Sequence, residues 1–369
     1  MKKILLALII LSAIAAVACD DTPQTGSVFQ DHQGVTYDDG SGLSDIMDGK
    51  DFFYGNLHAH TTYSDGTGTP AEGYQWARDN AGFDFYAVTD HAEQVSSGEW
   101  DDTGVQANLF TVDNVFVAIR GFEWSHTKGH ANVYNTSNYT SALRSTSLSS
   151  FADWVDANNG LAQFNHPGRE SNMFNDFSYD KSITDNVVSI ETGNKGSGNN
   201  HGEYLSKFPT CLKRGWRVAP TNNQDNHGLS TNSHRTVMIA NALTYNSLME
   251  AYAARRVYSS DDPNMRVVFK VGAHWMGEVV NISAGNYTAI IRVEDDEPIS
   301  KIEIISYDDT LVTSLTVSGT QNYVEWNPVL NVNSDAFYYV KVYGADTNND
   351  ESAYSEQIAV TAPIWLNVQ

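Results

Sequence analysis

Short apolar runs alternate with helical patterns between Asp51 and about Asn264. Thr69 and Pro70 supply an N-cap and a first-turn proline for one helix, and we expect further helices over residues 150–159 and 244–256. The apolar runs predicted to be strands are residues 52–57, 83–88, 115–119, 131–134, 161–165, 187–190, 218–221 and 237–239. Strands that alternate with helices in this way predict an α/β sheet or barrel over residues 51–264.

The pattern changes to all-β over residues 265–369. The expected strands are rich in Val, Ile, Thr and Tyr, and they cover residues 266–271, 288–293, 299–307, 311–317, 323–326, 337–343 and 357–360. About seven short strands in roughly a hundred residues fit an immunoglobulin-like β-sandwich. We see no catalytic pattern in this second domain, which could bind glycan, cover the rim of the first domain or act as a spacer.

The N-terminus has the features of a secretory signal. Lys2 and Lys3 precede an apolar stretch over residues 4–18 that is too short to cross a bilayer. The small residues before Cys19 resemble the lipobox of bacterial lipoproteins, which implies cleavage of residues 1–18 and lipidation of the Cys19 thiol. An ordinary signal peptide with an incidental cysteine is the alternative. Residues 19–50, rich in Asp, Gly, Ser and Thr, are then expected to be an acidic, solvated tether of an exported, membrane-anchored protein.

The formal net charge of −23 narrows the class of partner. Nucleic acid and anionic membrane surfaces are bound through basic faces, so neither is expected as the main partner, and the membrane contact would be the lipid anchor alone. An acidic protein is compatible with cations as cofactors.

Candidate metal ligands lie at the ends of predicted strands. His58 and His60 are two residues apart in an extended segment, so both imidazoles point to the same side. This pair alone is a weak signal. However, further acidic and histidine residues follow other predicted strands, namely Asp90, His91, Glu123, His166, Glu191, Asp225 and His227. Parallel α/β barrels assemble their sites at the carboxyl ends of their strands, so these side chains are expected to converge.

The motifs are specific as a set. They are His58-x-His60 with Ser64-Asp65-Gly66, Thr89-Asp90-His91, the turn at Glu123, Gly129-His130, Asn165-His166-Pro167, and Asp225-x-His227. Together they resemble the PHP (polymerase and histidinol phosphatase) superfamily of metal-dependent phosphoesterases, in particular the hydrolases related to the carbaryl-hydrolase group. The resemblance covers about residues 53–263, and it implies a distorted (β/α)7 barrel with a cluster of up to three divalent metal ions.

The resemblance also implies which residues bind each metal. It places His58, His60, Glu123 and Asp225 at a first ion, Asp65, His91 and His227 at a second, and His130 and His166, with Glu123 bridging, at a third. These residues are more numerous than the protein ligands of one cation, because a catalytic zinc takes about three. A multinuclear centre is therefore expected. Imidazole and carboxylate donors without thiolate suit zinc, manganese or iron.

The function expected from this centre is hydrolysis of a phosphate ester, such as a phosphodiester of a sugar, lipid or polyol. A hydroxide that bridges the metals would be the nucleophile, and Glu123, Asp225 and Asp65 would hold the centre together. Two alternatives stay open: a carboxyl or carbamate ester hydrolase with the same cluster, and a non-enzymatic metal-binding surface lipoprotein. The export signal disfavours the polymerase-associated and histidinol phosphate subfamilies.

Residues around the centre are less clearly defined by the sequence. Arg169 and His201 are our candidates to contact a phosphate or protonate a leaving group, with an ordinary surface position as the alternative for each. Glu191 is either an extra ligand or a hydrogen-bonded structural carboxylate. Asp90 is either an orienting partner of His91 or a strand-end cap, and Asn165 would orient His166.

Overall fold

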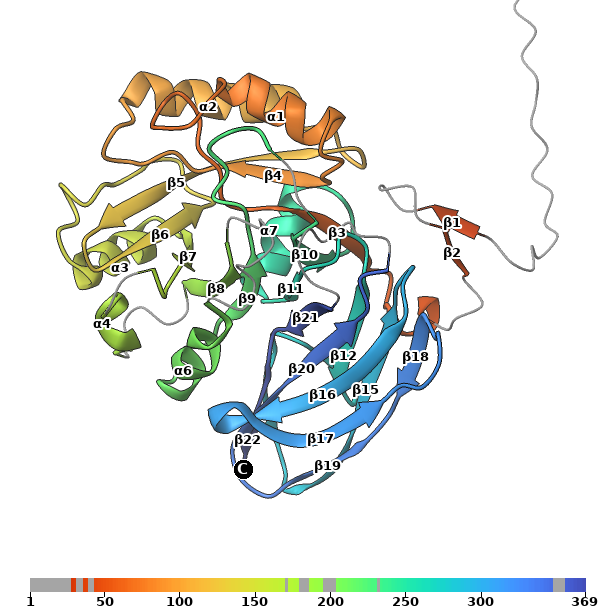
Figure 1. Cartoon of the computed structure of the whole chain (residues 1–369). Coiled ribbons are helices and arrows are strands. Elements are labelled where there is room, and N and C mark those ends of the chain that lie inside the picture. Colours follow the sequence, from red (N-terminus) through yellow and green to blue (C-terminus); the bar gives the residue numbers. More distant parts are fainter. Residues whose placement is uncertain are drawn as a thin grey trace, which may run out of the picture.

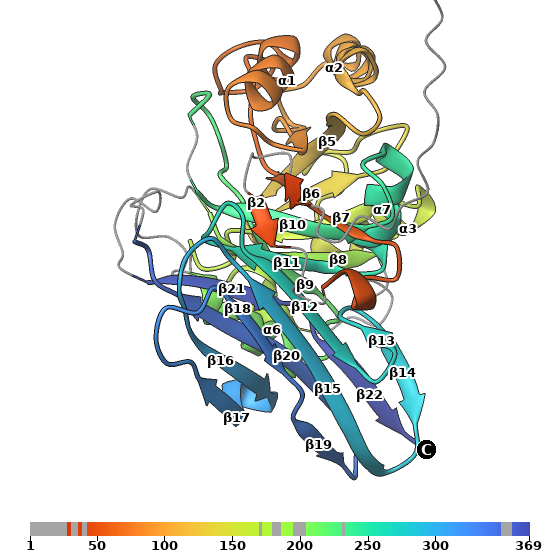
Figure 2. The same cartoon turned by 90° about the vertical axis from the view of Figure 1, so that its right-hand side faces the viewer.

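The computed structural model describes residues 28–30, 36–38, 43–169, 172–178, 186–194, 204–230, 233–347 and 356–369. Cys19, the expected signal sequence and His201 lie outside these ranges. Figures 1 and 2 show most of the helices towards one end of the molecule and a β-rich body at the other end, where the chain finishes. Within the described ranges, no helix is both long and apolar enough to cross a membrane.

Neighbouring strands, most of them paired in parallel, form the region of the sheet that carries the predicted ligands. In spatial order these strands are β3 (Asp51–Asn56), β4 (Phe85–Val88), β5 (Val117–His126), β6 (Gly129–Tyr134), β7 (Leu161–Asn165), β8 (Val187–Gly193) and β9 (Ala219–Asn222). The pairs β3–β4, β4–β5, β7–β8 and β8–β9 are parallel. The fold is therefore mixed α/β with a parallel-strand sheet.

Strand β6 runs antiparallel to both of its neighbours, whereas a regular (β/α)7 barrel would make it parallel. The reason is local, because only Thr127 and Lys128 separate β5 from β6, and a connection this short permits only a hairpin. The reversal places the first residues of β6, including His130, at the same edge as the carboxyl ends of the parallel strands.

The helices follow local end signals. They are α1 (Pro70–Asp79), α2 (Ser97–Phe110), α3 (Leu148–Ala157), α4 (Phe174–Phe177), α6 (Lys207–Lys213) and α7 (Tyr245–Ala253). Thr69 caps α1 in a capping box with Glu72, as the Thr-Pro sequence predicts, and Ser96 and Glu99 form the same motif at the start of α2. Helices α1, α3 and α7 confirm the three helices predicted from the sequence.

Two further strands join the ends of this series. Strand β10 (Arg235–Ala240) pairs antiparallel with β3, and β11 (Val257–Ser260) pairs antiparallel with β10. Thr236 of β10 faces β9, where its hydroxyl accepts a hydrogen bond from the backbone N–H of Asn222 at 3.1 Å. Beyond β3 and β9, Asn226 exchanges backbone hydrogen bonds with His58 and His60. The segments that follow the first and last strands are thus held side by side.

The β-rich part consists of two layers. The first layer contains β12 (Arg266–Val271), β13 (His274–Trp275), β15 (Gly285–Glu294), β18 (Tyr323–Trp326) and β19 (Val329–Val332). The second layer contains β14 (Val279–Ile282), β16 (Ile299–Ser306), β17 (Thr310–Thr316), β20 (Ala336–Gly344), β21 (Gln357–Thr361) and β22 (Ile364–Val368). The 3-10 turn η3 (Tyr307–Asp309) links β16 and β17. Because β21 pairs with both β20 and β11, the second layer continues into the sheet of the α/β part.

Part of the segment predicted to be a solvated tether is folded. Strands β1 (Val28–Gln30) and β2 (Thr36–Asp38) pair with each other, and the short turn η2 (Ser44–Ile46) follows. Leu43 and Met47 are buried in the main core, and the carboxylate of Asp48 lies 2.8 Å from Lys270 Nζ. A solvated tether is therefore wrong for residues 43–50, because two apolar side chains four positions apart are buried in the main core.

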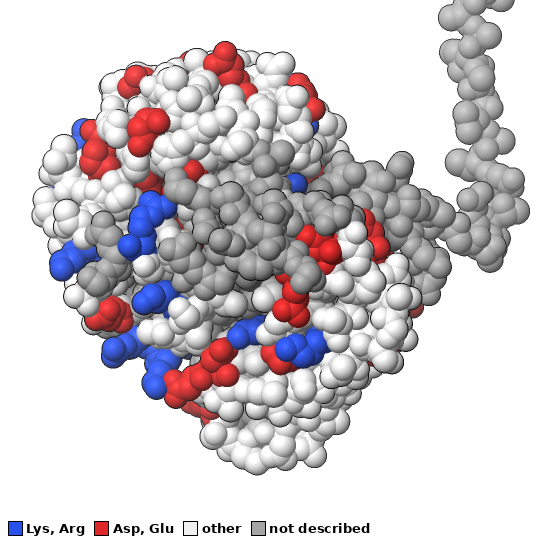
Figure 3. All heavy atoms as spheres, in the orientation of Figure 1, with Lys and Arg blue, Asp and Glu red and all other residues white. Residues whose placement is uncertain are grey.

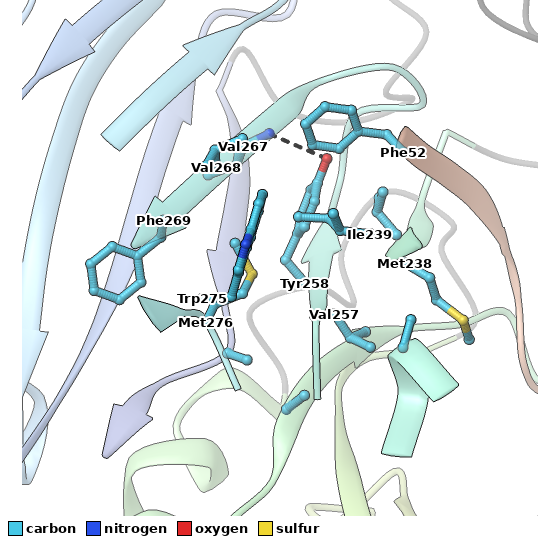
Figure 4. Close-up of a cluster of buried hydrophobic side chains, with 14 of the residues drawn as sticks. Phe52, Met238, Ile239, Val257, Tyr258, Val267, Val268, Phe269, Trp275 and Met276 are labelled. Carbon is cyan, nitrogen blue, oxygen red and sulfur yellow. Dashed lines mark hydrogen bonds between the residues drawn. The ribbon is translucent and has the colours of Figure 1, made fainter. Parts of the chain in front are cut away.

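The α/β part and the β-rich part share one apolar core (Figure 4). Phe52 of β3, Met238 of β10 and Tyr258 of β11 belong to the same buried cluster as Val267 and Trp275 of the second part. The Tyr258 hydroxyl also donates to the carbonyl of Met265 at 2.6 Å and accepts from the N–H of Val267 at 3.3 Å.

We therefore expect that a chain truncated after Asn264 fails to fold. Each large buried side chain contributes ~1.5–3 kcal/mol, and several would be exposed, against a net domain stability of only ~5–15 kcal/mol. Soluble yield and the near-ultraviolet circular dichroism of the truncated chain, compared with the full chain, measure this. A truncated chain that unfolds cooperatively and stays monomeric would contradict the shared core.

Candidate metal centre

Glu123 lies at the middle of a cluster of imidazoles. Strand β5 places its carboxylate at the carboxyl-end edge of the sheet, where it is 1% exposed. Its oxygens are 2.8 Å from His91 Nδ1, 3.3 Å from His58 Nε2, 3.3 Å from His130 Nδ1, 3.4 Å from His166 Nε2 and 3.7 Å from His60 Nε2. These histidines come from the segments after β3, β4 and β7 and from the start of β6. The sheet edge therefore brings together residues that are far apart in the chain.

Asp225 is a second buried carboxylate in the cluster. Its Oδ1 is 3.2 Å from His60 Nε2, and it is 3.5 Å from both His58 Nε2 and His227 Nδ1. The backbone of Asp225 has a φ of 45°, in the left-handed region that non-glycine residues seldom adopt. Strain of this kind persists where surrounding contacts fix the residue, and here two backbone hydrogen bonds of Asn226 fix the segment.

Asp65 marks the open side of the cluster. Its Oδ1 is 3.2 Å from His227 Nε2, 3.6 Å from His91 Nε2 and 3.8 Å from His60 Nδ1. The exposed fractions of the side chains divide the cluster into an open side and a buried side. On the open side, Asp65 is 48%, His227 31%, His130 30% and His91 16% exposed. On the buried side, each side chain is at most 3% exposed, and these are His58, His60, His166, Glu123 and Asp225. A substrate can therefore reach the centre from the side of Asp65, His91, His130 and His227.

All the metal ligands predicted from the sequence lie in this cluster. Their donor atoms fall into four overlapping groups, and the donor atoms of one group all lie within 4.8 Å of one another. The groups are His60, Asp65, His91 and His227; His58, His60 and Glu123; His58, His166 and Asp225; and His91, Glu123 and His130. The expected second set reappears with His60 added. The expected third set differs. His130 is grouped with His91 and Glu123, whereas His166 is grouped with His58 and Asp225.

The donor atoms fit metal ions. His58 Nδ1 is hydrogen-bonded to Glu191 at 2.9 Å, which leaves a lone pair on its Nε2, and this atom lies only 3.2 Å from His60 Nε2. His166 Nδ1 is buried without a hydrogen-bond partner among the described residues. Imidazole nitrogens that face one another and face carboxylates are the donor set of zinc, manganese or iron.

The electrostatics of the cluster keep its carboxylates ionised. Burial would raise the pKa of Glu123, but His58, His130 and His166 hold it well below its usual value. Burial likewise opposes the ionisation of Asp225, yet His58 and His60 hold its pKa well below the usual value. Two buried negative charges close together require compensation by cations.

Glu191 has a structural position behind His58. Its Oε1 lies 2.9 Å from His58 Nδ1 and accepts from Asn223 Nδ2 at 3.0 Å. Its Oε2 accepts from the backbone N–H of His166 at 2.7 Å and from Asn194 Nδ2 at 2.8 Å. Both oxygens are thus used in hydrogen bonds. Of the two roles left open by the sequence, the geometry favours the hydrogen-bonded carboxylate, which orients His58 and the turn at His166.

Asp90 and Asn165 act on residues other than those expected. Asp90 accepts hydrogen bonds from Thr61 N and Thr61 Oγ1, both at 2.7 Å, and from Ser64 Oγ at 2.5 Å, so it holds the turn after His60. Asn165 Nδ2 donates to Glu123 Oε1 at 2.8 Å. Of the two roles left open for Asp90, these contacts do not favour the orientation of His91, because the carboxylate binds the turn at Thr61 and Ser64. The expected role of Asn165 beside His166 is corrected, because its amide points to Glu123 on strand β5. Neither partner is adjacent in the sequence, which carries no signal for the pairing.

Arg169 lies beside the centre. Its Nη2 is 2.7 Å from Asp225 Oδ2, and its side chain is 36% exposed. Burial lowers the pKa of Arg169, but Asp225 raises it above the usual value, so the guanidinium is charged. It also donates to Asn194 Oδ1 at 3.4 Å. Asn194 is a contact that the sequence did not indicate.

Comparisons with known proteins do not establish a family for this chain. No protein-family model matches the chain, and no curated protein matches it in sequence. Among solved structures, the chain is similar to a two-domain protein from Bacteroides vulgatus that contains a predicted PHP-like metal-dependent phosphoesterase, with 16% identity, a TM-score of 0.47, and 86% of this chain and 95% of that chain covered. It is also similar to an engineered protein with 10% identity, a TM-score of 0.21, and 89% and 96% covered. Both TM-scores are below 0.5, so neither likeness establishes the fold or function of this chain.

Proposed function

We propose that this protein is a metal-dependent hydrolase that acts on phosphate esters. The observation that carries the proposal is the overlap of the four donor groups, in which His58, His60, His91 and Glu123 each belong to two groups. A structural site is usually closed by about four ligands that serve one ion. Donors shared between groups, with one side open to solvent, instead support a catalytic centre for several metals.

The residues of the chain divide the work of such a centre. Metals bound there would polarise a phosphate ester and lower the pKa of water. Glu123 and Asp225, held ionised by their surroundings, supply the negative charge that retains the cations. Glu191, Asn165 and Asp90 hold the ligands in place, while Asp65 and His227 border the open side.

The charge near the open side supports an anionic substrate. Arg169 presents a partly exposed guanidinium next to Asp225, and a guanidinium binds phosphate through two parallel N–H groups. Although the net charge is −23, Figure 3 shows Lys and Arg side chains gathered on the left half of the face seen there. Helix α6, with Lys207 and Lys213, lies on that side in Figure 1. The guanidinium of Arg169 beside the centre favours a phosphate ester over a neutral carboxyl or carbamate ester.

A panel of matched substrates tests the proposal. A phosphate monoester, a phosphodiester and a carboxyl ester of the same nitrophenol leaving group should be compared on metal-loaded, full-length protein. We expect turnover of a phosphate ester that a chelator abolishes and that added zinc, manganese or iron restores. Preferred turnover of the carboxyl ester would favour the alternative hydrolase, and metal-loaded protein without turnover on any extended panel would favour the non-enzymatic alternative.

Replacing Arg169 with alanine should raise KM for the phosphate ester about tenfold, because a charge-assisted hydrogen bond of ~1.4 kcal/mol is lost. The carboxyl ester, which carries no phosphate charge, should be hardly affected. Steady-state kinetics of both substrates measure the difference, with Arg169→Lys as a partial rescue and the exposed Arg144→Ala as a matched control. Equal losses on both substrates would show that Arg169 acts only by holding Asp225.

A further inference from the structure

A second set of donor atoms lies away from the metal centre, where the two parts of the chain meet. Asp262 belongs to the connection between β11 and β12, and Asp295 and Asp296 belong to the connection between β15 and β16. One carboxylate oxygen from each of the three lies within 4.8 Å of the others. Asp262 is 0% and Asp295 is 1% exposed, whereas Asp296 is exposed, so the cluster opens to solvent on one side.

The buried Asp295 is not satisfied by the described protein groups. Its Oδ1 accepts from the backbone N–H of Asp296 at 2.9 Å, but its Oδ2 is buried without a hydrogen-bond partner among the described residues. Burial, and then the nearby Asp262, Asp296 and Glu297, raise the pKa of Asp295 well above its usual value. A carboxylate in this position needs either a proton or a cation.

The amide of Asn264 lies beside the same carboxylates. Its Nδ2 donates to Asp295 Oδ1 at 3.1 Å and to Asp296 Oδ1 at 3.0 Å. These hydrogen bonds do not reach Asp295 Oδ2, which stays buried without a partner among the described residues.

We propose that Asp262, Asp295 and Asp296 bind a Ca²⁺ ion that joins the β11–β12 connection to the β15–β16 connection. All the donors are oxygens, which suits a hard cation, and the set lacks the imidazoles that define the metal centre. Irregular geometry built from two loops suits Ca²⁺ better than Mg²⁺, which demands near-ideal octahedral geometry. This site is independent of the proposed hydrolase activity.

The position of the site gives it a structural role. Asp262 Oδ1 accepts from the backbone N–H of Asn264 at 2.6 Å, just before β12 begins. The neighbouring Asp261 accepts from Asn222 Nδ2 at 3.0 Å and from the N–H of Ile358 at 3.2 Å, which fastens the same connection to β9 and β21. An ion here would brace the junction of the two parts, so Ca²⁺ should stabilise the whole chain.

Binding of Ca²⁺ to the full-length protein, with the metal centre already filled with Zn²⁺, tests the proposal. Equilibrium dialysis with radioactive Ca²⁺ should find about one ion per chain, and Ca²⁺ should raise Tm by several degrees. Asp295→Asn and the exposed Asp296→Asn should lose both effects. The exposed Asp113→Asn, outside the cluster, and His60→Ala, in the metal centre, should keep both.

Two results would overturn the proposal. The first is that the wild-type protein binds no Ca²⁺, that its Tm does not change with Ca²⁺, and that the Asp295→Asn variant is at least as stable as the wild type. The cluster would then be held by a proton and by the Asn264 amide as donor. The second is Ca²⁺ binding that survives in both Asp295→Asn and Asp296→Asn but disappears in His60→Ala, which would locate the ion in the metal centre.

Discussion

Substituting Glu123 with alanine should abolish turnover and reduce the metal content of the purified protein. The carboxylate of Glu123 lies within 3.7 Å of five imidazoles and belongs to two of the donor groups, so its loss removes a ligand that no neighbour replaces. We expect a fall in kcat/KM of at least ~10³-fold, since residues that act as one unit lose most of the activity together. Steady-state kinetics and elemental analysis of the same preparation measure both effects.

The variant Glu123→Gln separates charge from packing. Glutamine keeps the volume of the side chain and an oxygen that can accept from Asn165 Nδ2, so the fold should persist. The negative charge is lost, so metal content and turnover should still fall. Full turnover in either variant would show that Glu123 does not hold the metals.

A second large effect is expected at Glu191, which touches no substrate in our account. Glu191→Gln should lower metal affinity and turnover by ~10–100-fold, the usual result of removing a group that orients a metal ligand. The cause is that glutamine keeps one acceptor oxygen where five donors converge. These donors are His58 Nδ1, Gln163 Nε2, Asn223 Nδ2, Asn194 Nδ2 and the N–H of His166. Titration of the metal-free protein with Zn²⁺, read by calorimetry, gives the affinity directly.

The alanine variant at the same position should behave differently. Glu191→Ala leaves these donors buried without an acceptor, and breaking a buried charged network costs ~3–5 kcal/mol, so we expect a large fall in Tm. Glu325→Ala, which removes an exposed carboxylate far along the chain, is the control for purification and folding. Wild-type zinc affinity in Glu191→Gln would contradict a positioning role for Glu191.

The convergence of the candidate ligands could be predicted from the sequence because these residues lie at the ends of recognisable strands. His58, His91 and His166 each follow a short apolar run, and the carboxyl ends of neighbouring parallel strands meet at one edge. Even His130, on the reversed strand β6, reaches this edge because a hairpin places the start of β6 beside the end of β5. The convergence of the candidate ligands could thus be predicted without knowing every strand direction.

The partners of the ligands could not be predicted in the same way. Glu191 and His58 are 133 residues apart, and Asn165 and Glu123 are 42 apart, so only the folded sheet brings them together. Helix α2 was missed because its sequence includes two glycines and little apolar periodicity, and its capping box at Ser96 is the signal that could have revealed it. The buried segment around Met47 was missed because two apolar residues in a polar stretch give no periodic pattern.

X-ray diffraction from crystals of the purified chain, recorded on both sides of the absorption edge of the metal that elemental analysis finds, is the most direct test of the multinuclear centre. We predict more than one anomalous peak between Glu123, Asp225 and the surrounding histidines. No peak in this cluster, or a single ion closed by about four ligands with the remaining histidines turned away, would contradict it.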